Sequence, residues 1–223
     1  PIPANISVIF DIQDMLDELH LDPPFAPGND LGAIRMTLLS QRDPVEPENY
    51  SNIWGWNNGI TYLAIIGNVP GTTFYDVTEP VNPVQVGFID GPDSSWREIK
   101  TYKNFAYIVT EGSGPGQGLQ IVDLTNPLNP TLVNTYAVNF NTAHTLFIDE
   151  AIGRAYINGT NNHGSASGMR ILTLEPNPAS PVEVGAWTPR YVHDMYAANG
   201  RAFLSEIYDG LQEVYDATDP ANL

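Results

Sequence analysis

The chain has 223 residues, with 26 acidic side chains, 9 basic ones and a formal net charge of −17. Nucleic acids and anionic membrane surfaces are therefore excluded as favoured partners, because binding to them needs clustered Lys and Arg. The chain has no cysteine, which excludes disulfides and thiol chemistry, and no apolar run is long enough to predict a transmembrane segment.

Residues 1–33 carry no repeat, and we expect them to form an N-terminal arm with one short helix. Residues 11–20 place Ile12, Met15, Leu16 and Leu19 at the spacing of an apolar helical stripe. The proline-rich residues 22–28 then indicate an extended linker. The stripe is expected to pack on the remaining chain or on a neighbouring copy.

Residues 34–223 contain a repeat and are predicted to form one domain. The phrase Asp-x-Thr-x-Pro begins at Asp76, Asp123 and Asp216, with a degraded copy at 173–176, so that successive copies are 43 to 50 residues apart. Repeats of this length, built from short apolar runs and Gly/Pro turns, are typical of four-stranded antiparallel blades. The predicted fold class is therefore an all-β β-propeller, with repeats at approximately 50–92, 93–139, 140–188 and 189–223.

The repeated Asp is interpreted as a turn residue, not a catalytic one. Its carboxylate can accept hydrogen bonds from nearby backbone N–H groups, while the following prolines stiffen the exit from the turn. A second repeated feature is an aromatic residue in the second strand of each blade, which the alignment places at Tyr62, Tyr107, Tyr156 and Phe203.

The fourth repeat stops before its outer strand should begin. This leaves two hypotheses: the chain is a piece of a larger propeller, or residues 34–40 supply the missing strand and close a ring. We favour the first for the number of blades and still expect residues 34–40 to act as a closure strand. Open blade edges would invite partner chains or self-association.

Alignment of the innermost strands predicts a polar ring at the mouth of the central channel. Ser51, Arg97, His144 and His193 fall at one aligned position, and Asn52, Glu98, Thr145 and Asp194 fall at the next. Strands converge at this mouth, and ligand sites on such scaffolds form where strands converge.

Three interpretations of the ring remain open. His144 and His193, with a carboxylate from Glu98 or Asp194, could bind a divalent metal such as zinc. Alternatively, Arg97, Glu98, His144, His193 and Asp194 bind a small polar ligand, with Trp96 as a stacking face. The third interpretation is a water-filled channel whose polar groups only order the blades.

Four segments carry a resemblance to a known family: residues 50–56, 95–100, 119–123 and 192–195. Together they resemble LVIVD-repeat propellers, in particular the choice-of-anchor B family, over approximately residues 34–223. The resemblance implies an exported protein that is secreted or attached to the cell surface. The members of that family share no common reaction, so the resemblance does not indicate whether the chain is an enzyme.

The sequence thus favours an extracellular binding or structural module. Its expected partners are protein or glycan surfaces, or further copies assembled through blade edges or the N-terminal arm. The alternative function is a metal-dependent enzyme with His144 and His193 at its centre.

Overall fold

The computed structural model describes residues 38–42, 49–162 and 165–223. The chain separates into two compact units, residues 1–39 and 40–223, and every described strand belongs to the second unit. The predicted helix at 11–20 and residues 34–37 of the predicted closure strand lie outside the described residues. Residues 38–40, the rest of that segment, are described and are not in a strand.

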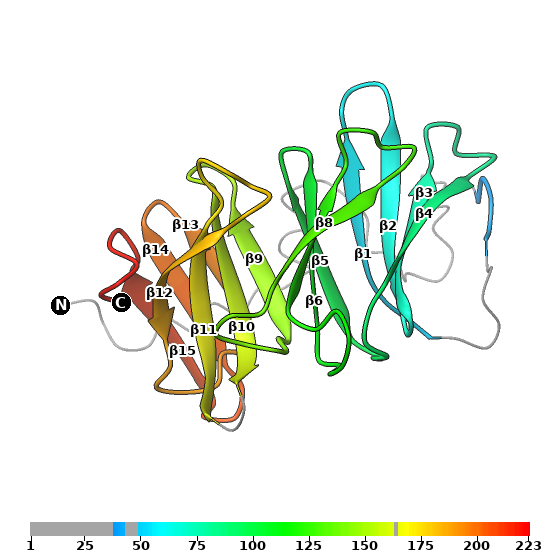
Figure 1. Cartoon of the computed structure of the whole chain (residues 1–223). Coiled ribbons are helices and arrows are strands. Elements are labelled where there is room, and N and C mark those ends of the chain that lie inside the picture. The colour runs from blue at the N-terminus through cyan, green and yellow to red at the C-terminus, as the bar shows by residue number, and fades with distance from the viewer. Residues whose placement is uncertain (1–37, 43–48, 163–164) are drawn as a thin grey trace, which may run out of the picture. The chain divides into compact units, whose positions relative to one another are not determined.

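The described strands form four antiparallel sheets, each with its strands in chain order (Figure 1). The first sheet comprises β1 (Tyr50–Asn57), β2 (Tyr62–Asn68), β3 (Gly71–Asp76) and β4 (Val84–Asp90). The second comprises β5 (Arg97–Tyr102), β6 (Phe105–Thr110), β7 (Leu119–Asp123) and β8 (Thr131–Tyr136). The third comprises β9 (Thr145–Asp149), β10 (Arg154–Asn162), β11 (Ser165–Thr173) and β12 (Val182–Trp187). The fourth comprises β13 (Asp194–Ala198), β14 (Arg201–Glu206) and β15 (Leu211–Asp216).

This architecture confirms the prediction of an all-β propeller built from antiparallel blades. The fourth sheet has three strands within the described residues, as its truncated repeat indicated. No helix in the described parts of the chain is long and apolar enough to cross a membrane.

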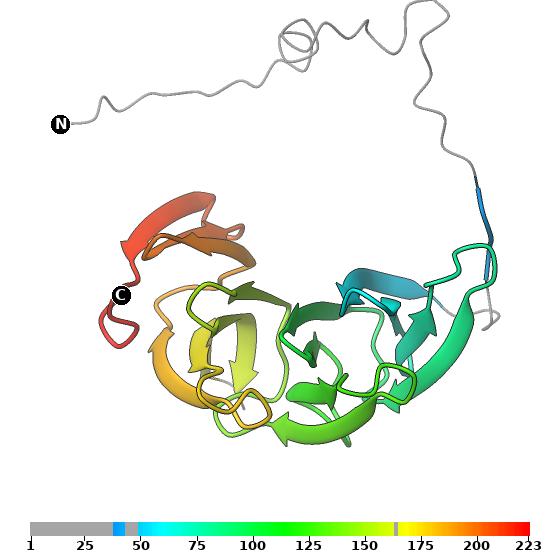
Figure 2. The same ribbon diagram turned by 90° about the horizontal axis from the view of Figure 1, so that it is seen from above.

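The sheets of this unit follow one another in chain order (Figure 2). The innermost strands contact in sequence, β1 with β5, β5 with β9, and β9 with β13. Among the described strands, none of the first sheet contacts one of the fourth. The row of sheets therefore has two ends.

The apolar core consists of three layers, each between two successive sheets. Ile65 and Phe74 of the first sheet pack with Ile99 and Val122 of the second. The layer between the second and third sheets includes Tyr107, Ile121, Leu146 and Leu172. The layer between the third and fourth includes Tyr156, Ile171, Met195 and Leu204. Because the second sheet is covered on both faces, its central strands β6 and β7 are buried almost throughout.

The repeated Asp forms the turn that the sequence predicted. The Oδ1 atoms of Asp76, Asp123 and Asp216 accept hydrogen bonds from the backbone N–H two residues later, over 2.9, 2.7 and 2.9 Å. These bonds fix the direction in which the chain leaves the third strand of each blade. The corner is therefore a structural device.

The pairing register corrects one aligned position. Tyr107 pairs with Ile121, and the residue of the first sheet at the same place is Ile65, which pairs with Phe74. Tyr62 instead begins β2 and pairs with Asn57 of β1. The sequence alignment placed aromatic residues of the second strands at one position. In the structure, equivalent residues are those that pair with the residue two positions before the corner Asp.

Glycines in two outer strands allow the next sheet to approach closely. A Cβ on Gly185 of β12 would lie 1.8 Å from the Pro220 carbonyl oxygen, and one on Gly87 of β4 would lie 2.7 Å from Pro130 Cγ. Both contacts are with the corner of the following sheet. The outer strand of each of these blades thus rests on its neighbour's corner.

We expect Gly185→Ala to lower the free energy of unfolding by about 1–3 kcal/mol, because the added methyl forces β12 away from the fourth sheet. Urea denaturation measures the loss. Gly55→Ala is the matched control, since a Cβ there meets nothing within 4 Å. Equal stability of the two variants would contradict close packing at this corner.

Candidate functional site

The pairing register reproduces the predicted alignment of the innermost strands. Ile53, Ile99, Leu146 and Met195 pair with Ile66, Ile108, Ile157 and Leu204, respectively. Arg97, His144 and His193 therefore hold equivalent positions in three sheets, whereas a register shift between Tyr50 and Ile53 interrupts the pairing at Ser51. The structure brings the two histidines into contact and gives Arg97 a different environment.

Arg97 is a buried link between the first two sheets. Its side chain is fully buried, its Nε donates to the Asn68 carbonyl over 2.7 Å, and its Nη2 donates to the Val69 carbonyl over 2.9 Å and to that of Pro92. Burial lowers the pKa of Arg97, and the nearby carboxylates of Asp93 and Asp90 oppose this. Its contacts support a structural role within the blade junction.

Glu98 belongs to a polar group that also joins the first two sheets. Its carboxylate accepts a hydrogen bond from Asn52 Nδ2 over 3.0 Å and contacts the Lys100 ammonium. Lys100 Nζ in turn lies 4.3 Å from the centre of the Trp54 ring. Burial raises the pKa of Glu98 and Asp194 adds to this, while the Lys100 contact lowers it. The net shift is upward.

The raised pKa of Glu98 predicts a pH-dependent stability difference. Folding favours the protonated carboxyl, so its contribution is complete below the ordinary Glu pKa of about 4.3 and is lost as pH rises through the raised value. Glu98→Gln should therefore become more stable relative to wild type as pH rises from that range to neutrality. Urea unfolding at a series of pH values measures this, with Glu79→Gln as a control for net charge. A difference that does not change with pH would contradict the shift.

Trp96, His144 and His193 stack across three successive sheets. The Trp96 and His144 rings lie 4.7 Å apart at an interplanar angle of 5°, and the two imidazoles lie 4.4 Å apart at 34°. Backbone carbonyls hold the stack in place: Trp96 Nε1 donates to His144 O over 2.6 Å, and Thr145 Oγ1 donates to His193 O over 2.8 Å. The structure thus brings together the two aligned histidines and Trp96, which the sequence analysis offered as a stacking face.

Three further residues complete this group, and the sequence reasoning did not select them. Glu111 Oε1 lies 2.7 Å from His144 Nδ1. The ring centre of Tyr191 lies 6.3 Å from the ring centres of both His144 and His193, and the ring centre of Tyr208 lies 4.9 Å from that of Tyr191. The sequence could have indicated Tyr191, because it precedes His193 by two positions. In an extended chain, side chains two residues apart point to the same side. Glu111 and Tyr208 lie in loops for which the strand alignment gives no register.

We call these six residues the aromatic–histidine cluster: Trp96, Glu111, His144, Tyr191, His193 and Tyr208.

The cluster combines unsatisfied buried nitrogens with accessible aromatic rings. Within the described part of the chain, His144 Nε2 and His193 Nδ1 are buried without a hydrogen-bond partner. Trp96 is 37% exposed and Tyr208 is 77% exposed. Burial raises the pKa of Tyr191 to about 12, with Glu111 and Tyr208 contributing, so its hydroxyl stays protonated at neutral pH. The exposed rings can stack on a ligand, and a movement of the cluster side chains would bring the imidazole nitrogens within hydrogen-bonding reach of it.

Asp194 lies apart from these contacts. Its side chain accepts a hydrogen bond from the adjacent Met195 N–H over 2.8 Å. The residue lines a depression on the fourth sheet together with Tyr196, Phe203 and Val214. It therefore belongs to the surface of that sheet.

No group of three His, Asp or Glu side chains in the described residues is arranged to hold a metal ion. His144 and His193 supply two candidate ligands. Glu111 is positioned to orient His144 through Nδ1, in the way that carboxylates orient metal-binding imidazoles.

Comparison with known proteins identifies the repeat and the fold. Residues 95–138, which contain the second sheet, match the LVIVD repeat family. No curated protein matches the sequence significantly.

The solved structures that are similar to this chain include the following two. One, from Bacteroides uniformis, is described as a candidate 6-phosphogluconolactonase and has a TM-score of 0.60 at 12% identity, covering 79% of this chain and 52% of that one. The other, a protein of unknown function from Desulfotomaculum acetoxidans, has a TM-score of 0.56 at 18% identity, covering 79% and 60%. At these identities the similarity shows the fold alone, and the chain spans only part of either protein.

Proposed function

We propose that the chain is a binding module of an exported, cell-surface or secreted propeller of the choice-of-anchor B kind. In this proposal the aromatic–histidine cluster binds a sugar residue of a glycan. The observation that carries it is the pair of buried, unpartnered imidazole nitrogens on His144 and His193 beside the exposed rings of Trp96 and Tyr208.

A sugar has an apolar face that suits the aromatic rings of the cluster and hydroxyl groups that suit its hydrogen-bonding atoms. The C–H face of a pyranose is apolar and packs on an aromatic ring, as any apolar surface does, while its hydroxyl groups donate and accept hydrogen bonds. A sugar hydroxyl could donate to whichever imidazole nitrogen carries no proton and accept from the Tyr191 hydroxyl. Because an unsatisfied buried polar atom costs about 1–3 kcal/mol, a ligand that pairs with it gains affinity.

Charge narrows the class of glycan. Glu111 is an exposed acid in the cluster, and the whole chain has a net charge of −17. A neutral or amino sugar therefore fits better than a sulfated or uronic acid-rich glycan.

The exported location rests on the family resemblance. The match of residues 95–138 to the LVIVD repeat supports this assignment, and the acidic composition is compatible with it. Detection of the protein in the culture medium or on intact cells of its source would test the location.

The binding proposal is tested with a glycan array, followed by calorimetry on the glycans that bind. Tyr208→Ala should weaken binding about 3- to 10-fold, because a stacked aromatic contact contributes about 0.5–1.5 kcal/mol. His193→Phe should also weaken it, since the ring is kept while the nitrogens are lost. Tyr62→Ala is the matched control, an exposed tyrosine that begins β2. The proposal fails if no glycan binds, or if the control weakens binding as much as Tyr208→Ala.

A metal-dependent enzyme is the second candidate, and the His144–Glu111 contact favours it. An imidazole whose Nδ1 is held by a carboxylate presents Nε2 to a metal, and His193 lies beside it. Two protein ligands would leave open positions for water and substrate. It ranks second because the described residues supply no third ligand.

Elemental analysis tests this candidate. Stoichiometric zinc or another transition metal in the purified protein, lost in the His144→Ala/His193→Ala variant, would support a metal centre. Glu111→Gln should weaken metal retention about 10- to 100-fold if the carboxylate orients His144. Metal-free wild-type protein that also fails to take up added zinc would rule the candidate out.

A further inference from the structure

Glu111 is the acidic member of the aromatic–histidine cluster, and its side chain is 52% exposed. Its Oε1 atom lies 2.7 Å from His144 Nδ1. Within the described residues, no salt bridge joins Glu111 to a Lys or an Arg. A carboxylate accepts hydrogen bonds at two oxygens, so Glu111 can contact a ligand while it holds His144. The cluster therefore presents an accessible negative charge.

The basic side chains near the cluster are paired with other acids. Arg190 lies in the same loop as two members of the cluster, and its Nη1 lies 3.1 Å from Glu206 Oε2 and 2.8 Å from Glu213 Oε2. Lys100 contacts the carboxylate of Glu98. Neither base pairs with the acid of the cluster, and the whole chain has a net charge of −17. These surroundings favour a ligand that carries a positive charge.

The accessible charge lies close to an accessible aromatic ring. Arg97 pairs with Thr110, so Trp96 and Glu111 are the next residues beyond the ends of two paired strands. Both contact the same imidazole: Trp96 stacks on His144 with the ring centres 4.7 Å apart, and Glu111 contacts its Nδ1. Trp96 is 37% exposed. The second sheet, from which both residues extend, has a described sheet on each side, so these exposures are those of an internal blade.

A glycine bulge brings the Tyr191 hydroxyl next to His144. The register of β10 against β11 shifts around Gly159, which has a φ of +59°. A Cβ on Gly159 would lie 2.7 Å from His144 Cβ and 3.0 Å from the Tyr191 hydroxyl oxygen. Only glycine allows both this backbone conformation and this close approach at low cost. The bulge therefore adds a hydroxyl donor to the carboxylate and the aromatic ring.

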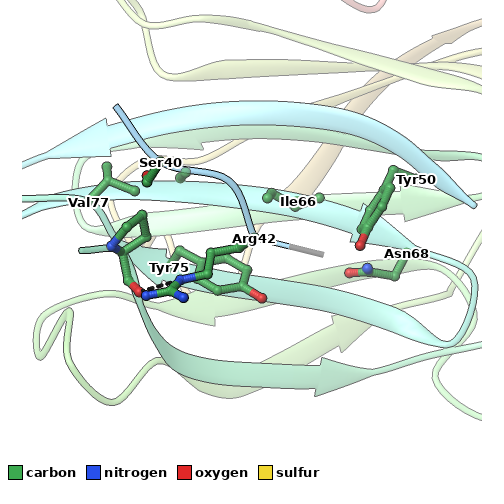
Figure 3. Close-up of a pocket in the computed structure, with 9 residues that line it drawn as sticks. Ser40, Arg42, Tyr50, Ile66, Asn68, Tyr75 and Val77 are labelled. Carbon is green, nitrogen blue, oxygen red and sulfur yellow. Dashed lines mark hydrogen bonds between the residues drawn. The ribbon is translucent and has the colours of Figure 1, made fainter. Parts of the chain in front are cut away.

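A pocket on the first sheet carries the opposite charge. Figure 3 shows the Arg42 guanidinium beside the Tyr75 ring in this pocket. Arg42 Nε donates to the Pro83 carbonyl over 3.3 Å, and its Nη2 donates to Asn82 Oδ1 over 3.1 Å. Both partners are neutral, so the positive charge of Arg42 is not matched by them and would repel a cationic ligand. The aromatic–histidine cluster is the better place for such a ligand.

We propose that the sugar bound at the cluster is an amino sugar whose amine is not acetylated and carries a proton. This inference rests on the proposed glycan function and narrows its ligand. The ammonium group donates charge-assisted hydrogen bonds to Glu111, the C–H face of the sugar ring packs on Trp96, and the Tyr191 hydroxyl donates to a sugar oxygen. N-acetylation removes the positive charge and with it the contact with Glu111.

The experiment is calorimetry with two trisaccharides, one of β-1,4-linked glucosamine and one of its N-acetylated form, at a pH at which the free amine is protonated. Wild-type protein is expected to bind the amino form about 3- to 10-fold more tightly, because an ion pair and a cation near an indole each contribute modestly. The preference should decrease as salt is added, since salt screens an exposed ion pair.

Two variants locate the source of the preference. Glu111→Gln should make the two affinities about equal, because the amide keeps the shape of the side chain and removes its charge. Glu79→Gln removes one charge from an exposed position at the corner of the first sheet, so it is the matched control and should leave the preference unchanged.

The outcomes separate this inference from the broader glycan proposal. Equal affinities of the two trisaccharides for wild-type protein would overturn the amino-sugar assignment and leave the glycan proposal standing. Failure of both to bind would also overturn it, and the glycan array then decides the broader proposal. A preference that survives in Glu111→Gln, or a lysine tripeptide that binds as tightly as the amino trisaccharide, would overturn it too, because the attraction would then come from the overall charge of the chain.

Discussion

The structure depends on the burial of one apolar sheet face against the next. An isolated blade exposes two apolar faces, so it gains stability only when neighbours cover them. Ile65, Tyr107 and Tyr156 are buried at the same place in three consecutive sheets because each has a following sheet. Phe203 occupies that place in the fourth sheet and is exposed. The same constraint therefore explains the core.

The candidate site is a consequence of this stacking. Trp96, His144 and His193 come from consecutive sheets and meet because their innermost strands lie side by side in matching register. The hydrogen bonds that hold them go to backbone carbonyls of the following sheet, so the site and the scaffold share contacts. A ligand at this cluster would bridge blades, and its binding would stabilise the junctions that form the site.

Polar residues of the inner row divide into two classes. Arg97 and Glu98 form their hydrogen bonds at the junction between the first and second sheets, although Arg97 Nη1 is buried without a partner in the described residues. His144 and His193 keep buried nitrogens without a partner in the described residues. The difference that matters for function is the surroundings, because the two histidines lie beside the exposed rings of Trp96 and Tyr208, whereas Arg97 is enclosed in the junction. Burial by itself would not have separated these residues.

The sequence by itself determined the repeat, the strand order, the Asp-based corner and the alignment of the inner row. These features are local or periodic: a turn residue acts on its own backbone, and strand alternation fixes which residues share a face. It also indicated three strands for the fourth sheet within the described residues. It misplaced Tyr62, because an aromatic residue at a strand entry resembles one inside the strand.

Only the tertiary structure decided which members of the inner row meet and which residues join them. Glu111 and Tyr208 reach the histidines from loops, whose paths no periodicity specifies. Arg97 and His193 are equivalent in sequence, yet Arg97 extends into the junction behind it while His193 stacks on its neighbour. Side-chain length and the carbonyls within reach made that difference, and both depend on how adjacent sheets pack.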